Sequence, residues 1–276
     1  MDLALEIAGD WVLDPMLWKH SVPRDNTVRQ LVDLYLVYCI GGALMYLIPA
    51  TLDFYFLFDK KWMQDKQWIP GQVALELKLA LSSIPQMSLL MTVVSIWELK
   101  GHSRLYDNVS DFGLPYFVFS IFAFFMFTDC LVYWFHRWLH LPVLYKHIHK
   151  PHHKWKVASP FASHAFHPLD GFIQGFPYHI AVFIFPVHKV LWMCMFVAIN
   201  MWTISIHDGH FAVPNWKWAR WLVNGAAHHT DHHLFFNYNY GQYFTIWDRI
   251  GGSYMYPTKV KQAEDADAKL KLAKAA

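Results

Sequence analysis

The sequence predicts an all-α integral membrane protein with several spans and a cytosolic, histidine-rich helical cap that holds two metal ions. Of its 276 residues, 55% are hydrophobic and 18% are aromatic, which exceeds what a soluble domain of this length normally carries. Uncharged segments long enough to cross a bilayer recur along the chain. Eighteen histidines are present, and fourteen of them fall in two windows, 136–167 and 207–233. Such clustering indicates a metal site.

Two early segments are predicted to cross the membrane. Residues 34–52 and 79–97 each run for nineteen positions without a formal charge. At about 1.5 Å per residue, a helix of that length crosses a hydrocarbon layer of about 30 Å. A third span is expected over 115–134, where Asp129 is the only charge, and it should end at the membrane surface near His136.

The apolar stretch 172–206 is predicted to form a membrane hairpin. Histidine windows flank it on both sides, so the chain must return to the face that it left if the histidines form one site. Pro186 and Lys189 mark the expected turn. Seven basic residues flank the histidine windows, and the positive-inside rule therefore places that face in the cytosol. These residues are Arg137, Lys146, Lys150, Lys154, Lys156, Lys217 and Arg220.

The chain divides into three predicted regions. Residues 1–113 form an N-terminal membrane-anchoring region with two spans, and 114–256 form a catalytic domain that contains the third span and the hairpin. Residues 257–276 form a polar C-terminal tail, expected to be a solvated helix or disordered. Because the acidic start lacks a basic segment before an apolar core, the first span is expected to serve as the targeting signal. Four or five spans fit this pattern, with the N-terminus in the lumen.

Three histidine motifs carry the predicted chemistry. His136 and His140 are four residues apart, a spacing that places both rings on one face of a helix. Two further motifs read HxxHH, and their rings are expected to converge on one side of a helix. Together the motifs supply eight imidazoles, enough for two ions with three or more nitrogens each and open positions for O₂. The HxxHH members are His149, His152, His153, His229, His232 and His233.

A ninth candidate ligand, His207, lies where the hairpin returns to the cytosolic face. The adjacent Asp208 is expected to orient its ring, and Asp231 and His167 are candidates for the same supporting role. Single histidines elsewhere are more often structural than functional. The sequence leaves open the roles of four others, His147, His164, His210 and His228.

The ligand type narrows the choice of metal. All-imidazole ligation admits zinc, copper or iron. A hydrolytic zinc enzyme typically carries HExxH, and a soluble di-iron bundle carries repeated ExxH motifs, and neither pattern occurs in this chain. Two iron ions are therefore expected, because iron connects such a cluster to O₂ chemistry in a membrane. Zinc could occupy the site in recombinant samples.

The motifs and their surroundings resemble the sterol C5-desaturase branch of the fatty acid hydroxylase superfamily. The resemblance covers roughly 127–256, including Tyr145–Trp155 (YKHIHKPHHKW), Pro160–Pro168 (PFASHAFHP) and Asn224–His233 (NGAAHHTDHH). It implies that the nine histidines are the metal ligands. Two positions depart from the family pattern. Leu141 stands where many members have a further histidine, and His210 replaces what is commonly an acidic residue.

The resemblance also implies an activity and its partners. It implies a multi-pass endoplasmic-reticulum enzyme, with its active site facing the cytosol, that uses O₂ to form the C5–C6 double bond of a Δ7-sterol. Electrons would come from NADH through cytochrome b5 and its reductase. The residues agree with an external donor, because the chain lacks a flavin motif, a glycine-rich dinucleotide loop and a thiolate cluster site. Membrane lipid is a further expected partner, and nucleic acid is not.

Two surfaces are predicted to serve these partners. Four lysines beside the second histidine motif form a basic patch that could dock an acidic electron carrier or attract lipid headgroups. They are Lys146, Lys150, Lys154 and Lys156. Five aromatic residues could line a sterol site, although aromatic residues more often serve packing. They are Phe161, Phe166, Phe235, Phe236 and Tyr243.

Other functions share parts of this pattern. A C4-methylsterol oxidase or a fatty-acyl or sphingolipid hydroxylase would use the same di-iron site. A metal transporter or another metal-binding membrane protein should place its ligands near the middle of the bilayer, whereas these histidines lie at span ends and in basic loops. A haem-binding electron carrier needs only axial pairs and leaves most of the motifs unexplained.

Overall fold

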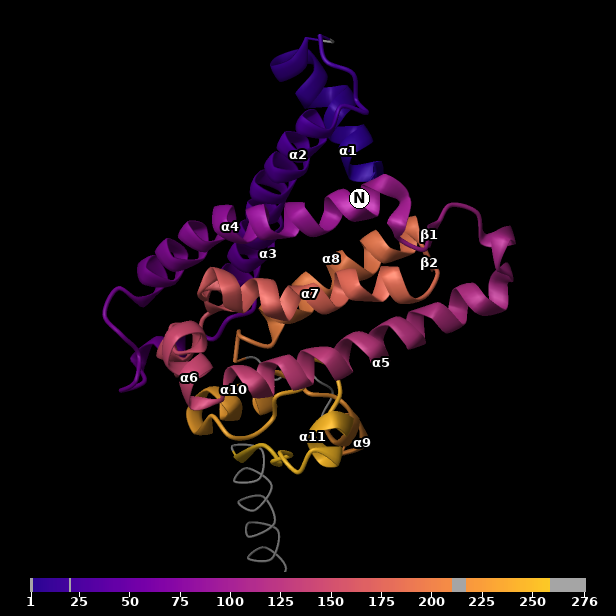
Figure 1. Ribbon diagram of the computed structural model, residues 1–276. Coiled ribbons are helices and arrows are strands. Elements are labelled where there is room, and N and C mark those ends of the chain that lie inside the picture. The colour runs from indigo at the N-terminus through magenta and orange to yellow at the C-terminus, as the bar shows by residue number, and fades with distance from the viewer. Residues whose placement is uncertain (1, 20, 210–216, 259–276) are drawn as a thin grey trace, which may run out of the picture.

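The computed structural model describes residues 2–19, 21–209 and 217–258. It is mostly helical, as expected. The predicted tail from 259 onward and His210 lie outside the described residues. Figure 1 shows α4, the pair α7 and α8, and α5 as successive layers, with α9, α10 and α11 on the far side of α5.

The N-terminal part leads into one long apolar helix. It comprises α1 (Asp2–Ala8), a π-helix (Gly9–Trp18), α2 (Thr27–Leu36), a π-turn (Val37–Gly41) and α3 (Gly42–Phe56). Asn26 caps the start of α2 by accepting a hydrogen bond from the Arg29 N–H at 3.1 Å. Exposed apolar side chains recur every fourth residue along one face, which is the pattern of a lipid-facing stripe. They are Ile40, Leu44, Ile48 and Leu52.

The next two helices run between the two ends of the fold. A 3-10 turn (Lys60–Gln64) precedes α4 (Gln72–Trp97), which continues into a π-turn (Glu98–His102). After β1 (Leu105–Tyr106) and a 3-10 turn (Val109–Asp111), α5 covers Gly113–Leu139. Helical stretches 27–56, 72–102 and 113–139 are long and apolar enough to cross a membrane. Each contains one predicted span, so the three spans are confirmed as apolar helices of sufficient length.

The predicted hairpin is also present. Helices α7 (Pro168–Ile184) and α8 (Lys189–Ser205) are joined at β2 (Val187–His188), the position expected for the turn. Strand β2 pairs in parallel with β1, and the Arg104 N–H donates to the Val182 carbonyl at 2.6 Å. The hairpin turn therefore meets the α4–α5 connection at the end of the fold away from the histidines, and α8 returns the chain to the histidine end.

Short elements build the histidine end. They are α6 (Pro142–Leu144), a π-turn (Tyr145–His149), 3-10 turns (His152–Lys154 and Pro160–His164), α9 (Lys217–Leu222), α10 (Ala226–Phe235) and α11 (Ile246–Ile250). Asp129 of α5 anchors the segment before α11, because its carboxylate accepts the backbone N–H groups of Gln242 at 3.0 Å, Tyr243 at 2.7 Å and Phe244 at 3.2 Å. This polar anchor fixes a loop against a membrane helix.

Two apolar clusters hold the layers together. The larger joins α5 to the hairpin through buried Phe124, Tyr178 and Trp192. A second joins α3 and α4 to the histidine end, and there the Tyr46 hydroxyl donates to the Phe161 carbonyl at 2.9 Å. The division at residue 113 remains a prediction, and these contacts show that the N-terminal region packs directly on the rest of the chain.

Candidate metal centre and substrate cavity

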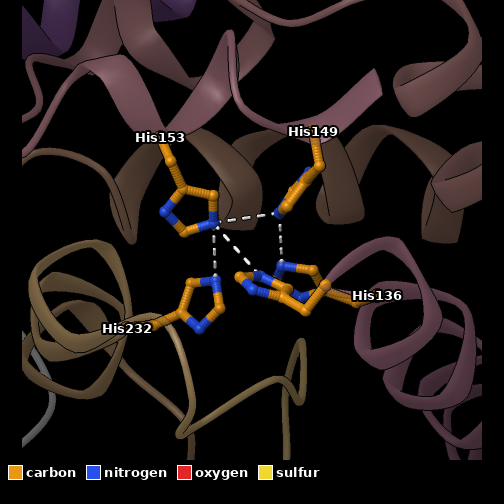
Figure 2. Close-up of side chains that lie close together, drawn as sticks. His136, His149, His153 and His232 are labelled. Carbon is orange, nitrogen blue, oxygen red and sulfur yellow. Dashed lines mark hydrogen bonds between the residues drawn. The ribbon is translucent and has the colours of Figure 1, made fainter. Parts of the chain in front are cut away.

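Five histidines form the first potential metal-binding group. Their ligand atoms all lie within 4.8 Å of one another, and they are His136, His140, His149, His153 and His232. His136 projects from the last turn of α5, and His140 follows at the end of that helix. Figure 2 shows the rings of His136, His149, His153 and His232 turned toward a common centre. The Nε2 atom of His153 lies 3.0 Å from that of His149 and 3.1 Å from that of His232.

Hydrogen bonds at the opposite ring nitrogens orient three of these rings. The Nδ1 atom of His136 donates to the Tyr240 carbonyl at 2.9 Å, and that of His232 donates to the Tyr238 carbonyl at 2.7 Å. The Nδ1 atom of His149 lies 2.7 Å from a carboxylate oxygen of Asp170. A proton held at Nδ1 leaves the Nε2 lone pair free for a metal ion.

Four buried histidines form the second group. They are His152, His207, His229 and His233, and their ligand atoms also lie within 4.8 Å of one another. The Nε2 atom of His229 lies 2.9 Å from that of His207 and 3.1 Å from that of His233. The two groups adjoin, because His152 and His153 are consecutive and the His153 and His233 ring centroids are 4.9 Å apart. All nine predicted ligands thus meet in two neighbouring groups.

The structure adds one feature of the HxxHH motifs that their spacing did not give. The rings of each motif are divided between the two adjoining groups. In the second motif a π-turn gives way to a 3-10 turn, which directs His149 and His153 to the first group and His152 to the second. In α10, His229 and His233 face the second group and His232 faces the first.

The arrangement fits metal ions rather than hydrogen bonds alone. Both His136 and His149 use their Nδ1 atoms toward oxygen acceptors, so two bare Nε2 lone pairs face each other at 3.1 Å. With both rings neutral, that contact has no proton, and a cation bound between the rings would complete it. Nε2 atoms of contacting ring pairs are 2.9 to 3.5 Å apart, and all ligand atoms of a group lie within 4.8 Å of one another. Neighbouring ligands at about 2.0–2.1 Å from one ion, as in zinc–imidazole sites, lie about 2.9–3.4 Å apart.

Burial keeps these rings in the form that binds metal. Burial lowers the pKa of the His207 ring to about 4. The pKa values of His140, His152, His153, His229, His232 and His233 are also lowered by burial and by the adjacent imidazoles. A neutral imidazole is the ligand form, so the cluster is prepared for metal at neutral pH.

The three residues predicted to support the ligands lie in three different environments. His167 caps α7 by accepting the Leu169 N–H at 3.2 Å, and it lies outside both groups. Asp231 accepts hydrogen bonds from the Thr258 backbone and hydroxyl at 2.6 and 2.8 Å. Asp208 is buried beside His207, but the Nδ1 atom of His207 donates to the Thr203 carbonyl at 2.6 Å. The His207 ring is therefore oriented by backbone.

Sequence reasoning missed Asp170, the carboxylate that orients His149. Both side chains are fully buried, and Asp170 also accepts a hydrogen bond from the Gln174 amide at 2.7 Å. A signal was available, because Asp170 is the only acidic residue between Asp129 and Asp208. A single carboxylate at the start of an apolar hairpin requires a buried partner.

Two histidines whose roles the sequence left open, His147 and His228, belong to neither group. His147 is exposed on the turn that carries the second motif. His228 is buried, and burial together with Arg249 lowers its pKa to about 4, but its ring lies beside Tyr254 at a centroid distance of 5.9 Å. Leu141 is exposed, and position 141 belongs to neither group.

An apolar cavity of about 400 Å³ reaches residues of both groups. His136, His152, His207 and His229 line its inner end, and residues from α3, α4, α7 and α8 form its walls. Of the five aromatic residues expected to line a substrate site, Phe166 does so. Phe161 and Tyr243 lie in the packed core, and Phe235 is exposed. A volume of this size is typical of small-molecule sites.

Comparison with known proteins agrees with this architecture. The fatty acid hydroxylase family model matches residues 121–253. Lathosterol oxidase of Rattus norvegicus is 49% identical over 260 residues, covering 94% of this chain and 86% of the relative. A delta(7)-sterol 5(6)-desaturase of Saccharomyces cerevisiae is 47% identical over 238 residues, covering 86% of this chain and 64% of the relative. No solved structure matches the chain.

The helical membrane fold with two adjoining imidazole groups is that of a membrane-bound oxidoreductase. The chain belongs to the fatty acid hydroxylase family. Within that family it is similar to lathosterol oxidases and to delta(7)-sterol 5(6)-desaturases, including one of Schizosaccharomyces pombe that is 44% identical over 258 residues.

Proposed function

We propose that this protein is a sterol C5(6)-desaturase, which uses O₂ to introduce the C5–C6 double bond into a Δ7-sterol. The observation that carries the proposal is the opening of two adjoining all-imidazole groups onto one apolar cavity among membrane helices. The names of relatives that are 47–49% identical over most of the chain support this choice of substrate.

The nine histidines are the proposed ligands of two iron ions. Five nitrogens would hold one ion and four the other. Iron bound there supplies O₂-dependent oxidation of unactivated C–H bonds. The chain orients the ligands through Asp170, Tyr238 and Tyr240, and it keeps the imidazoles neutral by burial. The apolar walls exclude water and hold a hydrocarbon ring against the metal end of the cavity.

The reaction requires an external electron donor. Reduction of O₂ to two waters takes four electrons, and loss of two hydrogens from the sterol provides two of them. We propose that NADH supplies the other two through cytochrome b5 and its reductase. All four lysines of the predicted basic patch, Lys146, Lys150, Lys154 and Lys156, are exposed on the segment that carries His149, His152 and His153. An acidic carrier bound there would lie close to both metal groups.

The proposed location is the endoplasmic-reticulum membrane, with the metal end facing the cytosol. The exposed lysines at this end support that orientation through the positive-inside rule. Membrane lipid would surround the apolar helices, and the sterol would enter from the bilayer.

The direct test is complementation of a cell that lacks C5-desaturase activity, with sterol profiling. Expression of this chain should restore 5,7-diene sterols, while His152→Ala and His232→Ala should not. His147→Ala is the matched control, because it removes an exposed histidine of the same segment. A product oxidised on the C4 methyl group or hydroxylated on an acyl chain would overturn the proposal in favour of a methylsterol oxidase or a hydroxylase.

The docking surface needs a separate measurement. Reversing the charge of the four lysines should lower turnover with reduced cytochrome b5 and leave turnover with a small chemical reductant unchanged. An equal loss with both reductants would contradict docking at this patch.

A further inference from the structure

A short polar chain interrupts the apolar wall of the cavity near its metal end. The Ser163 hydroxyl lies 2.7 Å from the Pro160 carbonyl and 3.1 Å from Nδ1 of His164. The Nε2 atom of His164 lies 3.3 Å from Oδ1 of Asn200. Ser163, His164 and Asn200 all line the cavity. The chain belongs to neither metal group.

This polar chain is one proton short. Three contacts link Pro160, Ser163, His164 and Asn200 in sequence. Burial lowers the pKa of His164 to about 4, so its neutral ring carries a single proton. The serine hydroxyl provides one more. Two protons cannot complete three hydrogen bonds, whichever nitrogen of the ring is protonated.

Reorientation of Asn200 does not supply the missing proton. Its amide Nδ2 donates to the Phe196 carbonyl at 2.8 Å. Turning the amide over would bring Oδ1 against that carbonyl and lose this bond. The His164 ring is itself held in place, because Tyr46 packs on it with centroids 4.8 Å apart. With Nδ1 protonated, Nε2 of His164 and Oδ1 of Asn200 are two acceptors that face each other at the cavity wall without a donor, whereas with Nε2 protonated the acceptor left over is the Pro160 carbonyl.

We infer that His164 and Asn200 form the subsite that receives the hydroxyl group of the sterol. The inference rests on the proposed function and adds the means by which the substrate is held. In the form with Nδ1 protonated, a ligand hydroxyl that donates to Oδ1 of Asn200 or to Nε2 of His164 supplies the missing hydrogen bond. Asn200 precedes the metal-group residue His207 by seven residues, which is about 10 Å along a helix.

The chemistry of a sterol agrees with this location. Its hydroxyl oxygen on C3 is three bonds from C5, so the group that binds it must lie near the metal end. Thr203 and Gln242 lie closer to His207, but there the Gln242 amide donates to the Thr203 hydroxyl at 2.8 Å, and that hydroxyl donates to the Ile199 carbonyl at 2.9 Å. This pair is complete without a ligand.

A second polar pair in the cavity is too distant. His179 lies 2.5 Å from a carboxylate oxygen of Glu98, and it follows Asp170 by nine residues of α7, about 14 Å along the helix. A sterol with C5 at the metal end would place its hydrocarbon side chain, and not its C3 hydroxyl, beside His179.

The test compares a Δ7-sterol with its 3-deoxy analogue, using purified metal-loaded protein. We expect the wild type to prefer the hydroxylated sterol by about 10-fold or more in equilibrium binding and in kcat/KM. His164→Phe and Asn200→Leu should bind and convert both compounds equally well, with unchanged metal content. Within one variant, the ratio of the values for the two sterols does not depend on the fraction of the protein that is folded. Ser88→Ala is the matched control, because it removes a hydroxyl from another part of the wall.

The outcomes separate this inference from the proposed function. Retention of the wild-type preference by both variants would overturn the subsite, even if every protein forms the 5,7-diene. Loss of the preference in both variants would support it. If wild-type protein prefers the hydroxylated sterol but oxidises it at another carbon, the proposed desaturation fails while the subsite stands.

Discussion

Asp170 accepts a hydrogen bond from Nδ1 of His149 at 2.7 Å, with both side chains fully buried. Asp170 lies at the start of the hairpin and His149 lies on the second histidine motif. The bond therefore connects the α7–α8 hairpin to the first metal group. It fixes the His149 tautomer and makes its Nε2 a better ligand.

Removing this carboxylate should weaken the first metal group. For Asp170→Asn we expect a metal affinity about 10–100-fold lower, because the neutral amide is a weaker acceptor for Nδ1–H than the carboxylate, and its N–H group can instead donate to Nδ1 and favour the wrong tautomer. Metal titration of chelator-treated protein in detergent measures the change. Asp107→Asn is the control, since Asp107 pairs with Lys189 at the opposite end of the fold. Equal affinities in Asp170→Asn and wild type would show that the bond has no part in binding.

Loss of one ligand should lower the metal content by an amount that depends on the group to which the ligand belongs. His229→Ala removes one of four ligands from the second group, and His232→Ala removes one of five from the first. We expect the four-ligand group to lose its ion more completely, because fewer nitrogens remain. Elemental analysis per protein chain should therefore give a lower metal content for His229→Ala. The exposed His147→Ala provides the control, and loss of metal there would contradict the assignment.

Metal-free protein should lose stability as the pH falls below 7. The pKa of His207 and that of His228 are lowered to about 4 in the folded protein, whereas both rings titrate near 6.5 when unfolded. Between these values the unfolded chain binds more protons, so the free energy of unfolding decreases with falling pH. Each ring contributes at most about 1.4 kcal/mol per pH unit. Thermal midpoints of chelator-treated protein at pH 7 and pH 5 test this, and equal midpoints would refute it.

A larger side chain at Gly42 should fill part of the cavity without displacing the residues around it. It lines the cavity, and a Cβ atom added there meets no other atom within 4 Å. Gly42→Leu should therefore fold, retain its metal and lose most sterol turnover, because the new side chain occupies substrate space. Gly42→Ala should keep most activity. Full turnover by the leucine variant would show that the sterol does not use this part of the cavity.

The sequence predicted the membrane architecture because charge and hydropathy act over long segments. The sequence was sufficient to predict the spans, the hairpin turn near Pro186 and the nine histidines of the two groups. Aromatic residues were less informative, because packing and substrate contact use the same side chains. Phe161 lies in the core, whereas Phe166 lines the cavity.

Features that depend on backbone geometry were not predictable. The second motif changes from a π-turn to a 3-10 turn between His149 and His152, and no sequence spacing reveals that change. The orienting acceptors of His136, His207 and His232 are backbone carbonyls, which carry no residue signature. Asp170 was identifiable as an isolated acid, but its partner became evident only from the fold.

The division of the second motif between the groups also governs how far apart the two ions can lie. His152 and His153 are consecutive, and their Cα atoms are separated by about 3.8 Å across one peptide bond. One covalent link between the groups is therefore independent of how the helices pack. Each group also takes a ligand from a longer helix, His136 at the end of α5 and His207 just after α8. A change in helix tilt would act on those two ligands, whereas the spacing of His152 and His153 along the chain would stay the same.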